Sequence, residues 1–205
     1  MDSQALAQLK MQRMHVAPRA LDLSPPEVQR RFAHVWAPLD ELASRLKGLP
    51  TGLVRFWLQQ PSGHVVITHL DSRYDPGEHR LKQQVLRNVA YVAVSDLALG
   101  ALEAVVPIAQ WLDHLLGNAG AEEGLWLSQG GGASPALREV GTRLAELFPL
   151  GHGFDAQACA DARTYFARSL ALYWFDRRAL NAADPLLERL LRTTVCTGTF
   201  WRSSD

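Results

Sequence analysis

The chain contains 205 residues, of which 47% are hydrophobic, and its 21 basic side chains are matched by 21 acidic ones. This length suits a compact domain that needs neither disulfides nor a structural metal to form a core. A composition near the globular average argues against a fibrous or largely disordered protein. Zero net charge argues against non-specific nucleic-acid binding. The basic residues are nearly all arginine, with only three lysines.

Two cysteines, Cys159 and Cys196, are too few for a disulfide framework and lack the spacing of a zinc finger. The N-terminal segment has no continuous apolar run, so it does not resemble a signal peptide. Asp96, Glu103 and Asp113 interrupt the most apolar region, which makes a membrane-spanning helix improbable. We therefore expect a cytoplasmic protein without a membrane partner, and the sequence gives no reason to assign a cofactor.

The first 23 residues predict an N-terminal helical arm, because Leu6, Leu9 and Met14 recur at nearly helical spacing. The remaining residues, 24–205, are expected to form a single helix-rich α+β domain. This arm would dock on the domain or on a second subunit.

Four dipeptides place a capping Ser or Asp before a proline, and this pattern is typical of helix starts. They are Ser24-Pro25, Asp75-Pro76, Ser134-Pro135 and Asp184-Pro185. A glutamate follows three residues after Ser24 and Asp75, which predicts a capping box at each. From these starts and from the apolar periodicity we predict helices at about 4–15, 25–36, 38–47, 76–98, 100–116, 135–148, 155–179 and 185–193.

Strands are fewer in the prediction. Residues 53–60 and 64–71 are rich in β-branched and aromatic side chains and are separated by Pro61-Ser62-Gly63, which indicates a hairpin. Residues 194–202 are a candidate third strand, and residues 124–128 are a weaker fourth. The expected fold is α+β and predominantly α-helical, with about seven or eight helices packed around a small antiparallel β-hairpin or three-stranded sheet.

Residues 117–134 form the one long glycine-rich connection, which we expect to be exposed and mobile. Gly130-Gly131-Gly132 precedes the cap at Ser134, so its backbone N–H groups are a candidate anion site. The run lacks both the Walker A and the dinucleotide-binding patterns, which favours a flexible connector instead.

The densest polar cluster lies between residues 69 and 79. His69, Asp71 and His79 are candidate metal ligands, with Arg73 as an anion clamp, because imidazole and carboxylate groups bind zinc, manganese and iron. None of the established metal-binding spacings occurs here, so a solvated turn is the alternative. Signatures of nucleophilic catalysis such as GxSxG and SxxK are also missing, and we assign no catalytic residue.

The predicted helix 155–179 combines an aromatic face with arginines. Tyr165, Phe166, Leu170, Tyr173 and Trp174 share that face. Four arginines that could bind nucleic acid, while an aromatic ring stacks on its bases, are Arg163, Arg168, Arg177 and Arg178. A core stripe with a charged outer face is the alternative interpretation.

The leading hypothesis is a non-catalytic helical adaptor or regulatory domain that acts through protein–protein contact, as a homo-oligomer or with another protein. Aromatic residues anchor many interfaces, and the candidate contact residues are Trp126, Tyr173, Trp174 and Trp201. Two alternatives stay open. One is a small-molecule- or metal-dependent activity at residues 69–79, and the other is a nucleic-acid-binding accessory protein that uses helix 155–179.

Overall fold

The computed structural model describes residues 3–150, 154 and 160–202. Backbone contacts divide the chain into two compact units, Met1–Ile108 and Ala109–Asp205. We call them the N-terminal unit and the C-terminal unit. The fold is α+β and mostly helical, as predicted, but its sheet is a four-stranded mixed sheet and not an antiparallel hairpin or three strands. The division into an arm of residues 1–23 and one domain of residues 24–205 stays a prediction.

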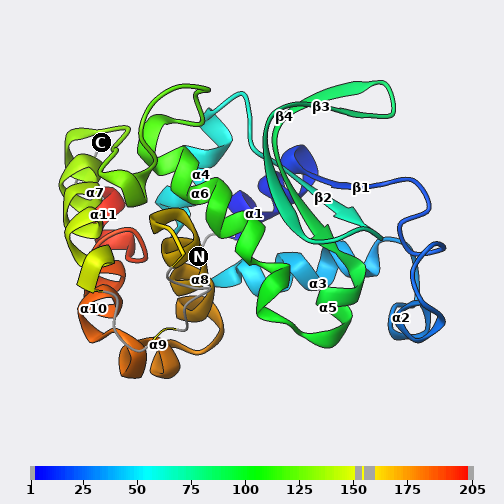
Figure 1. The fold of residues 1–205 in the computed structure, drawn as a ribbon. Helices are drawn as coiled ribbons and strands as arrows, with labels where there is room; N and C mark the ends of the chain where they lie inside the picture. The colour runs from blue at the N-terminus through cyan, green and yellow to red at the C-terminus, as the bar shows by residue number, and fades with distance from the viewer. Residues whose placement is uncertain (1–2, 151–153, 155–159, 203–205) are drawn as a thin grey trace. The chain divides into compact units, whose positions relative to one another are not determined.

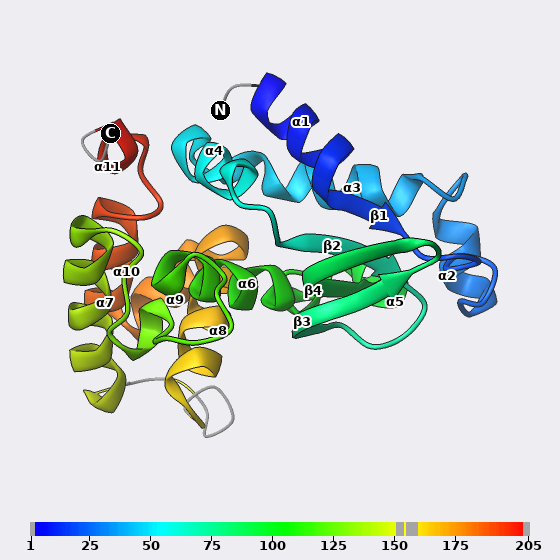
Figure 2. The ribbon, with the colours of Figure 1, turned by 90° about the horizontal axis from the view of Figure 1, so that it is seen from above.

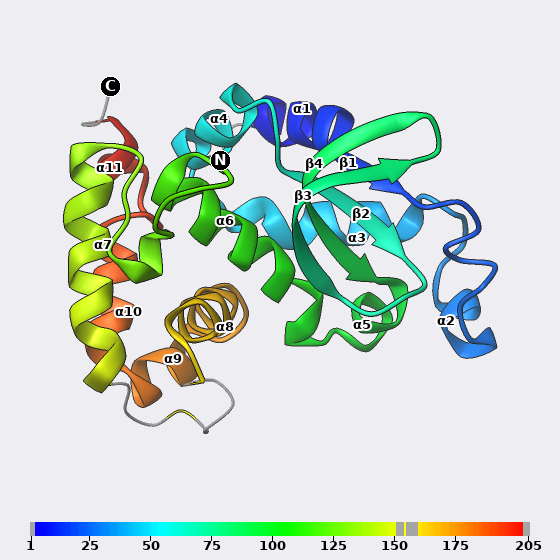
Figure 3. The same cartoon turned by 45° about the horizontal axis from the view of Figure 1, so that its top comes forward.

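The sheet lies in the N-terminal unit (Figure 1). Its strands are β1 (Met14–Val16), β2 (His64–Thr68), β3 (Arg73–Leu81) and β4 (Gln84–Ala93), in the order β1-β2-β4-β3. β1 pairs in parallel with β2, β2 in parallel with β4, and β3 antiparallel with β4. Because β2 pairs only with residues 89–93 of β4, the tip of the β3–β4 hairpin extends past β2 (Figure 3).

Helices α1 (Ser3–Arg13), α2 (Pro26–Arg31), α3 (Ala37–Arg45), α4 (Thr51–Gln59) and α5 (Val94–Leu99) complete this unit, with the 3₁₀ turns η1 (Leu46–Gly48) and η2 (Leu102–Ala104). α1 packs against α4, and α3 packs against α5 and β1. Buried β2 and β4 residues such as Val65, Ile67 and Val92 share the core with leucines of the helices. The indole of buried Trp57 donates a 2.8 Å hydrogen bond to Gly63 O, which ties α4 to the start of β2.

The predicted helix 76–98 is wrong, because these residues form β3, β4 and α5. Val89, Ala90, Val92 and Ala93 are all buried, so both faces of β4 are covered and the two-residue period of a strand is hidden. Asp75-Pro76 begins no helix; β3 is an edge strand that accommodates proline at the register shift between Asp75 and Glu78. Gly77 lies in this shift with a φ of 91°.

Two predicted strands are helical. Residues 53–59 of the predicted strand 53–60 lie in α4, where Leu53, Val54 and Trp57 are buried at helical spacing, so packing overrides their preference for strands. Residues 194–202 contain a turn and α11 (Gly198–Arg202), and the Trp201 indole donates to Val195 O at 3.0 Å. The weak candidate at 124–128 is also wrong, since it leads into the 3₁₀ turn η3 (Leu127–Gln129). The segment 64–71 does contain a strand, β2.

The C-terminal unit is helical. It contains most of α6 (Val106–Asn118), then η3, α7 (Pro135–Leu147), η4 (Phe148–Leu150), α8 (Ala162–Phe175), α9 (Arg177–Ala183), α10 (Pro185–Thr193) and α11. α10 packs against α7, α8 and α9, and Figure 2 shows α7 and α10 side by side. The caps predicted at Ser134 and Asp184 are confirmed, since each side chain accepts from a backbone N–H three residues later. The part of the predicted helix at 155–159 lies outside the described residues.

The glycine-rich connection 117–134 is not exposed throughout, because Trp126, Leu127, Ser128 and three of its glycines are buried. A Cβ atom at Gly117 would collide with the backbone of Trp126 and Leu127, and one at Gly131 would collide with Leu125 O. The glycines of this segment therefore allow close backbone packing.

We predict that Gly141→Ala destabilises the protein by about 1–3 kcal/mol. Gly141 lies inside α7, where alanine ordinarily favours the helix, but its Cβ atom would meet the carbonyl oxygens of Gly131 and Leu127. Denaturant unfolding measures the change. Gly198→Ala is the matched control, because nothing lies within 4 Å of the added atom in α11. Equal stability of the two variants would contradict this packing.

Candidate functional site

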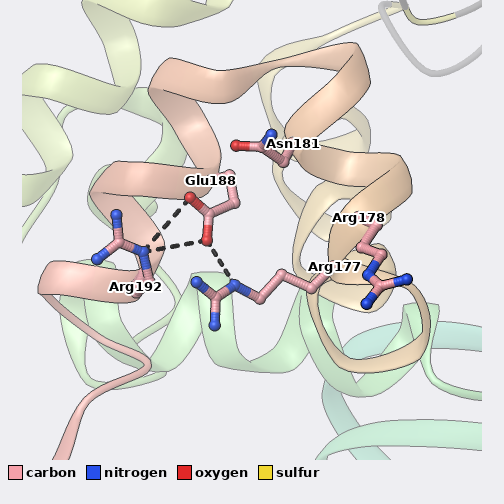
Figure 4. A pocket seen from close by; sticks show the side chains of 5 residues that line it. All are labelled: Arg177, Arg178, Asn181, Glu188 and Arg192. Carbon is pink, nitrogen blue, oxygen red and sulfur yellow. Dashed lines mark hydrogen bonds and ion pairs between the residues drawn. The ribbon is translucent and has the colours of Figure 1, made fainter.

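The C-terminal unit contains a cavity of about 550 Å³ lined by Arg177, Arg178, Asn181, Glu188 and Arg192. We call it the arginine pocket. Figure 4 shows that its side chains come from α9 and α10, with Glu188 between the guanidinium groups of Arg177 and Arg192. All five residues are polar, so this cavity differs from the mostly apolar pockets that bind typical small molecules.

Two aspartates build the helices of the pocket. Asp176 caps α9 by accepting from the backbone N–H groups of Arg178 and Ala179 at 3.1 and 3.0 Å. Asp184 caps α10 by accepting from Leu187 N at 2.9 Å, and it also accepts from the hydroxyl of buried Tyr165. These caps fix where α9 and α10 begin, and the lining side chains project from these two helices.

Glu188 is the central residue of the pocket, and its side chain is only 5% exposed. Arg177 Nε donates to Glu188 Oε1 at 2.5 Å, and Arg192 Nε donates to the same oxygen at 3.2 Å. A buried carboxylate needs partners of opposite charge, and these two guanidinium groups supply them. The bond to Glu188 also raises the pKa of Arg177 above its ordinary value.

The pocket has a surplus of positive charge, with three guanidinium groups against one carboxylate. Within the part of the chain that the structure describes, the Arg178 side chain has no acidic partner. A guanidinium group presents a planar fork of donors that matches the two oxygens of a carboxylate or phosphate. The arrangement therefore suits the binding of an oxyanion.

A second polar site lies deeper in the same unit. Asp113 of α6 is fully buried, and its two carboxylate oxygens accept from Ser128 N at 2.7 Å and from Ser128 Oγ at 2.6 Å. Burial raises the pKa of Asp113 to about 7, although the bonds from Ser128 act in the opposite direction. This pair holds η3 against α6, and both residues are too buried to meet a ligand.

The aromatic rings near this pair form a stack. The His114 ring lies parallel to the Trp126 ring, with their centroids 4.7 Å apart, and the Arg163 guanidinium lies 3.9 Å from the Trp126 centroid. The Trp126 indole is thus contacted by an imidazole and a guanidinium, and the residue is only 8% exposed. His114 also lies 2.7 Å from Ala121 O, which fixes the loop after α6.

A third site, in the N-terminal unit, joins Arg13, His15 and His64. Nε2 of His15 lies 3.0 Å from Nδ1 of His64, and Nε2 of His64 lies 3.5 Å from Arg13 Nη1. Arginine only donates, so the facing nitrogen of His64 accepts. The His64 proton then belongs on Nδ1, which donates it to His15. Burial lowers the pKa of both histidines, and that of His64 falls to about 4, with His15 and Arg13 adding to the effect.

The four predicted contact residues do not form one surface. Trp126 and Trp201 are buried, at 8% and 7% exposure, whereas Tyr173 and Trp174 are half-buried in α8. The Tyr173 ring does not line the arginine pocket, but it lies beside the pocket residue Arg177, whose guanidinium is 5.5 Å from the ring centroid. Most of the aromatic face of α8 is core, since Tyr165, Phe166 and Leu170 are buried.

Two of the four predicted nucleic-acid-binding arginines, Arg177 and Arg178, meet in the arginine pocket. Arg163 instead lies over Trp126, and Arg168 is a half-buried residue of α8. Neither of these two lines the pocket.

The predicted metal ligands are spread along the chain between β2 and the end of β3. His69 and Asp71 are exposed beyond β2, and His79 lies in β3 with its ring edge toward Tyr91. Among the described residues no group of three or more His, Cys, Asp or Glu side chains is placed to hold a metal ion. Arg73, the proposed anion clamp, pairs with Asp75 and lies over the Tyr91 ring.

Three residues of the pocket were not predicted from the sequence: Asn181, Glu188 and Arg192. Glu188 and Arg192 are four residues apart in a correctly predicted helix, which is a visible ion-pair spacing. Nothing in the sequence shows that Glu188 is buried, since that depends on how α10 packs. The pair of His15 and His64 was missed because it forms across two strands, and β1 was predicted as helix.

Neither a protein-family model, nor a curated protein, nor a solved structure matches this chain. Among the described residues no helix has the length and apolar character needed to cross a membrane.

We predict that Asp113 makes the C-terminal unit more stable in mild acid. Its folded-state pKa, about 7, exceeds the ordinary value of 3.8, so the folded state binds the proton more tightly than the unfolded state. This contribution is complete below pH 3.8 and is lost as the pH rises through 7, with a total of about 4 kcal/mol at most. Unfolding of the wild type and of Asp113→Asn across this range measures the difference. If the free energy of unfolding changed with pH in the same way in both proteins, the prediction would be contradicted.

We predict the opposite response for the N-terminal unit. Because the pKa of His64 is lowered, the folded state resists protonation, and stability is lost as the pH falls from 6.5 toward 4. Amide hydrogen exchange in β1 and β2 at pH 7 and pH 5 measures this loss. His64→Gln is expected to flatten the response, and an unchanged response in that variant would count against it.

Proposed function

We propose that this protein is a non-catalytic adaptor whose arginine pocket recognises an oxyanion, a phosphate or a carboxylate, on a partner protein. The observation that supports the proposal is the excess of guanidinium groups around the partly enclosed, buried carboxylate of Glu188. A pocket of about 550 Å³ has room for one or two acidic side chains of a docked segment.

The lining groups favour binding over proton transfer. A guanidinium group stays protonated near neutral pH, and an amide such as that of Asn181 does not titrate. The one carboxylate, Glu188, is held by Arg177 and Arg192, which makes it a poor general base. Glu188 instead orients its two arginines, and their remaining N–H groups are the donors available to an incoming anion.

The pocket also fits a protein partner better than a nucleic-acid strand. A carboxylate at its centre repels a chain of phosphates, whereas one or two oxyanions can bind to Arg178 and to the outer donors of its neighbours. The two other candidate arginines, Arg163 and Arg168, do not extend the pocket into a track that follows a strand. An exposed acidic segment of another protein, or of a second copy of this chain, supplies the required chemistry.

We predict that Arg178→Ala weakens the binding of an acidic peptide by roughly tenfold, the loss expected for one charge-assisted hydrogen bond. Arg178 is the residue to change, because it is exposed and Glu188 does not depend on it. Removing Arg177 or Arg192 would also leave a buried charge with fewer partners and confuse binding with folding. Calorimetry with phosphoserine-containing and glutamate-containing peptides, at low and high salt, makes the measurement.

Arg189→Ala is the matched control. Arg189 is an exposed arginine of α10, adjacent to Glu188 in sequence but outside the pocket lining. Equal losses in the two variants would mean that only overall charge matters and would refute the pocket. Tight binding of a single-stranded oligonucleotide that depends on Arg163 and Arg168 would favour the nucleic-acid alternative instead. The two peptides and inorganic phosphate together distinguish phosphate from carboxylate recognition.

A further inference from the structure

A loop after α6 contains the only two acidic residues that are adjacent in the sequence of the C-terminal unit, Glu122 and Glu123. We call residues 121–125 the acidic loop. All of its residues are exposed, and Leu125 is 57% exposed. The acidic loop therefore presents two carboxylates beside one apolar side chain on the surface of this unit.

The backbone of the acidic loop is held by side chains of α6. Asn118 Nδ2 donates to Ala121 O at 3.2 Å and to Glu123 O at 3.1 Å, and Gly120 N donates to Asn118 Oδ1 at 3.1 Å. His114 Nε2 lies 2.7 Å from the same Ala121 O. These contacts use backbone atoms of the acidic loop, so they do not depend on the two carboxylates. A loop that is ordered before it binds loses less conformational entropy on docking.

We propose that the arginine pocket of one chain binds the acidic loop of a second copy of the same chain. This inference rests on the proposed function and names the partner. The pocket has three guanidinium groups and one carboxylate, which leave two positive charges, and Glu122 and Glu123 supply two negative charges. Charges of opposite sign on the two surfaces favour this pairing, and the planar fork of a guanidinium group fits a carboxylate.

The two surfaces lie near opposite ends of α8, so they do not meet within one chain. Arg163, near the start of α8, lies over Trp126, the residue that follows the acidic loop. The arginine pocket instead begins at Arg177, just beyond the other end of α8. A helix of 14 residues is roughly 20 Å long. Figures 1 and 3 both show α8 between the loop after α6 and α9.

Contact between these surfaces therefore joins two chains head to tail. Such an interface uses a different patch on each chain, so every chain keeps one free pocket or one free loop until a ring closes. The exposed side chain of Leu125 adds an apolar contact beside the ion pairs. Because charges dominate the contact, association weakens as salt is added.

Analytical ultracentrifugation of the full chain over a wide range of concentrations tests the proposal. We expect the wild type to associate at low salt, and we expect Arg178→Glu to weaken association by at least roughly tenfold. The double variant Glu122→Lys, Glu123→Lys should show the same loss. An equal mixture of the two variants should associate again, because the intact loop of one meets the intact pocket of the other.

The double variant Glu139→Lys, Glu146→Lys is the matched control. It makes the same change of charge at two exposed positions of α7, and it should associate as the wild type does. An equal loss in this control, or a mixture of the two interface variants that stays monomeric, would overturn the proposal.

The glutamate-containing peptide distinguishes a failure of this inference from a failure of the proposed function. A wild type that stays monomeric at every concentration, yet binds the peptide through Arg178, would overturn self-association alone. A wild type that neither associates nor binds the peptide would overturn both.

Discussion

The ion pairs of buried Glu188 are the interaction on which the candidate site depends. A carboxylate that is 5% exposed is tolerated only because Arg177 of α9 and Arg192 of α10 donate to it. The same bonds join the two helices and restrict the two guanidinium groups. The energetic requirement of one buried charge therefore produces a fixed array of donors. Arg178, which has no acidic partner among the described residues, adds a third guanidinium group to this array. The side chains that satisfy the buried charge therefore also line the pocket.

Burial also acts on the two other polar sites, with different outcomes. Among the residues that the structure describes, Asp113 has no arginine in hydrogen-bond contact and relies on the donors of Ser128, and burial raises its pKa to about 7. His15 and His64 are joined by one hydrogen bond, and burial lowers the pKa of both rings. The guanidinium partners of Glu188 are held around the pocket, whereas burial shifts the pKa values of Asp113, His15 and His64.

The sequence predicted some of the elements that depend on local signals, although Asp75-Pro76 begins no helix. The caps at Ser134 and Asp184 define helix starts that need no distant contact, and α7 and α10 lie where they were predicted. β4 could not be recognised, because a strand covered on both faces carries no alternating pattern. The candidate site was likewise predicted only in part. Arg177 and Arg178 can be recognised as an arginine pair in the sequence, whereas the role of Glu188 depends on its burial, which only the packed helices determine.

The close packing of glycines around η3 leads to a practical way of recognising related chains. At Gly117, Gly131, Gly132 and Gly141 any side chain would overlap neighbouring backbone, so these positions tolerate no other residue without movement of the chain. Their intervals of 14, 1 and 9 residues are therefore set by the geometry of α6, η3 and α7. Surface residues in a distant relative can all differ, while this spacing of glycines, with a tryptophan five residues before the second of them, would persist.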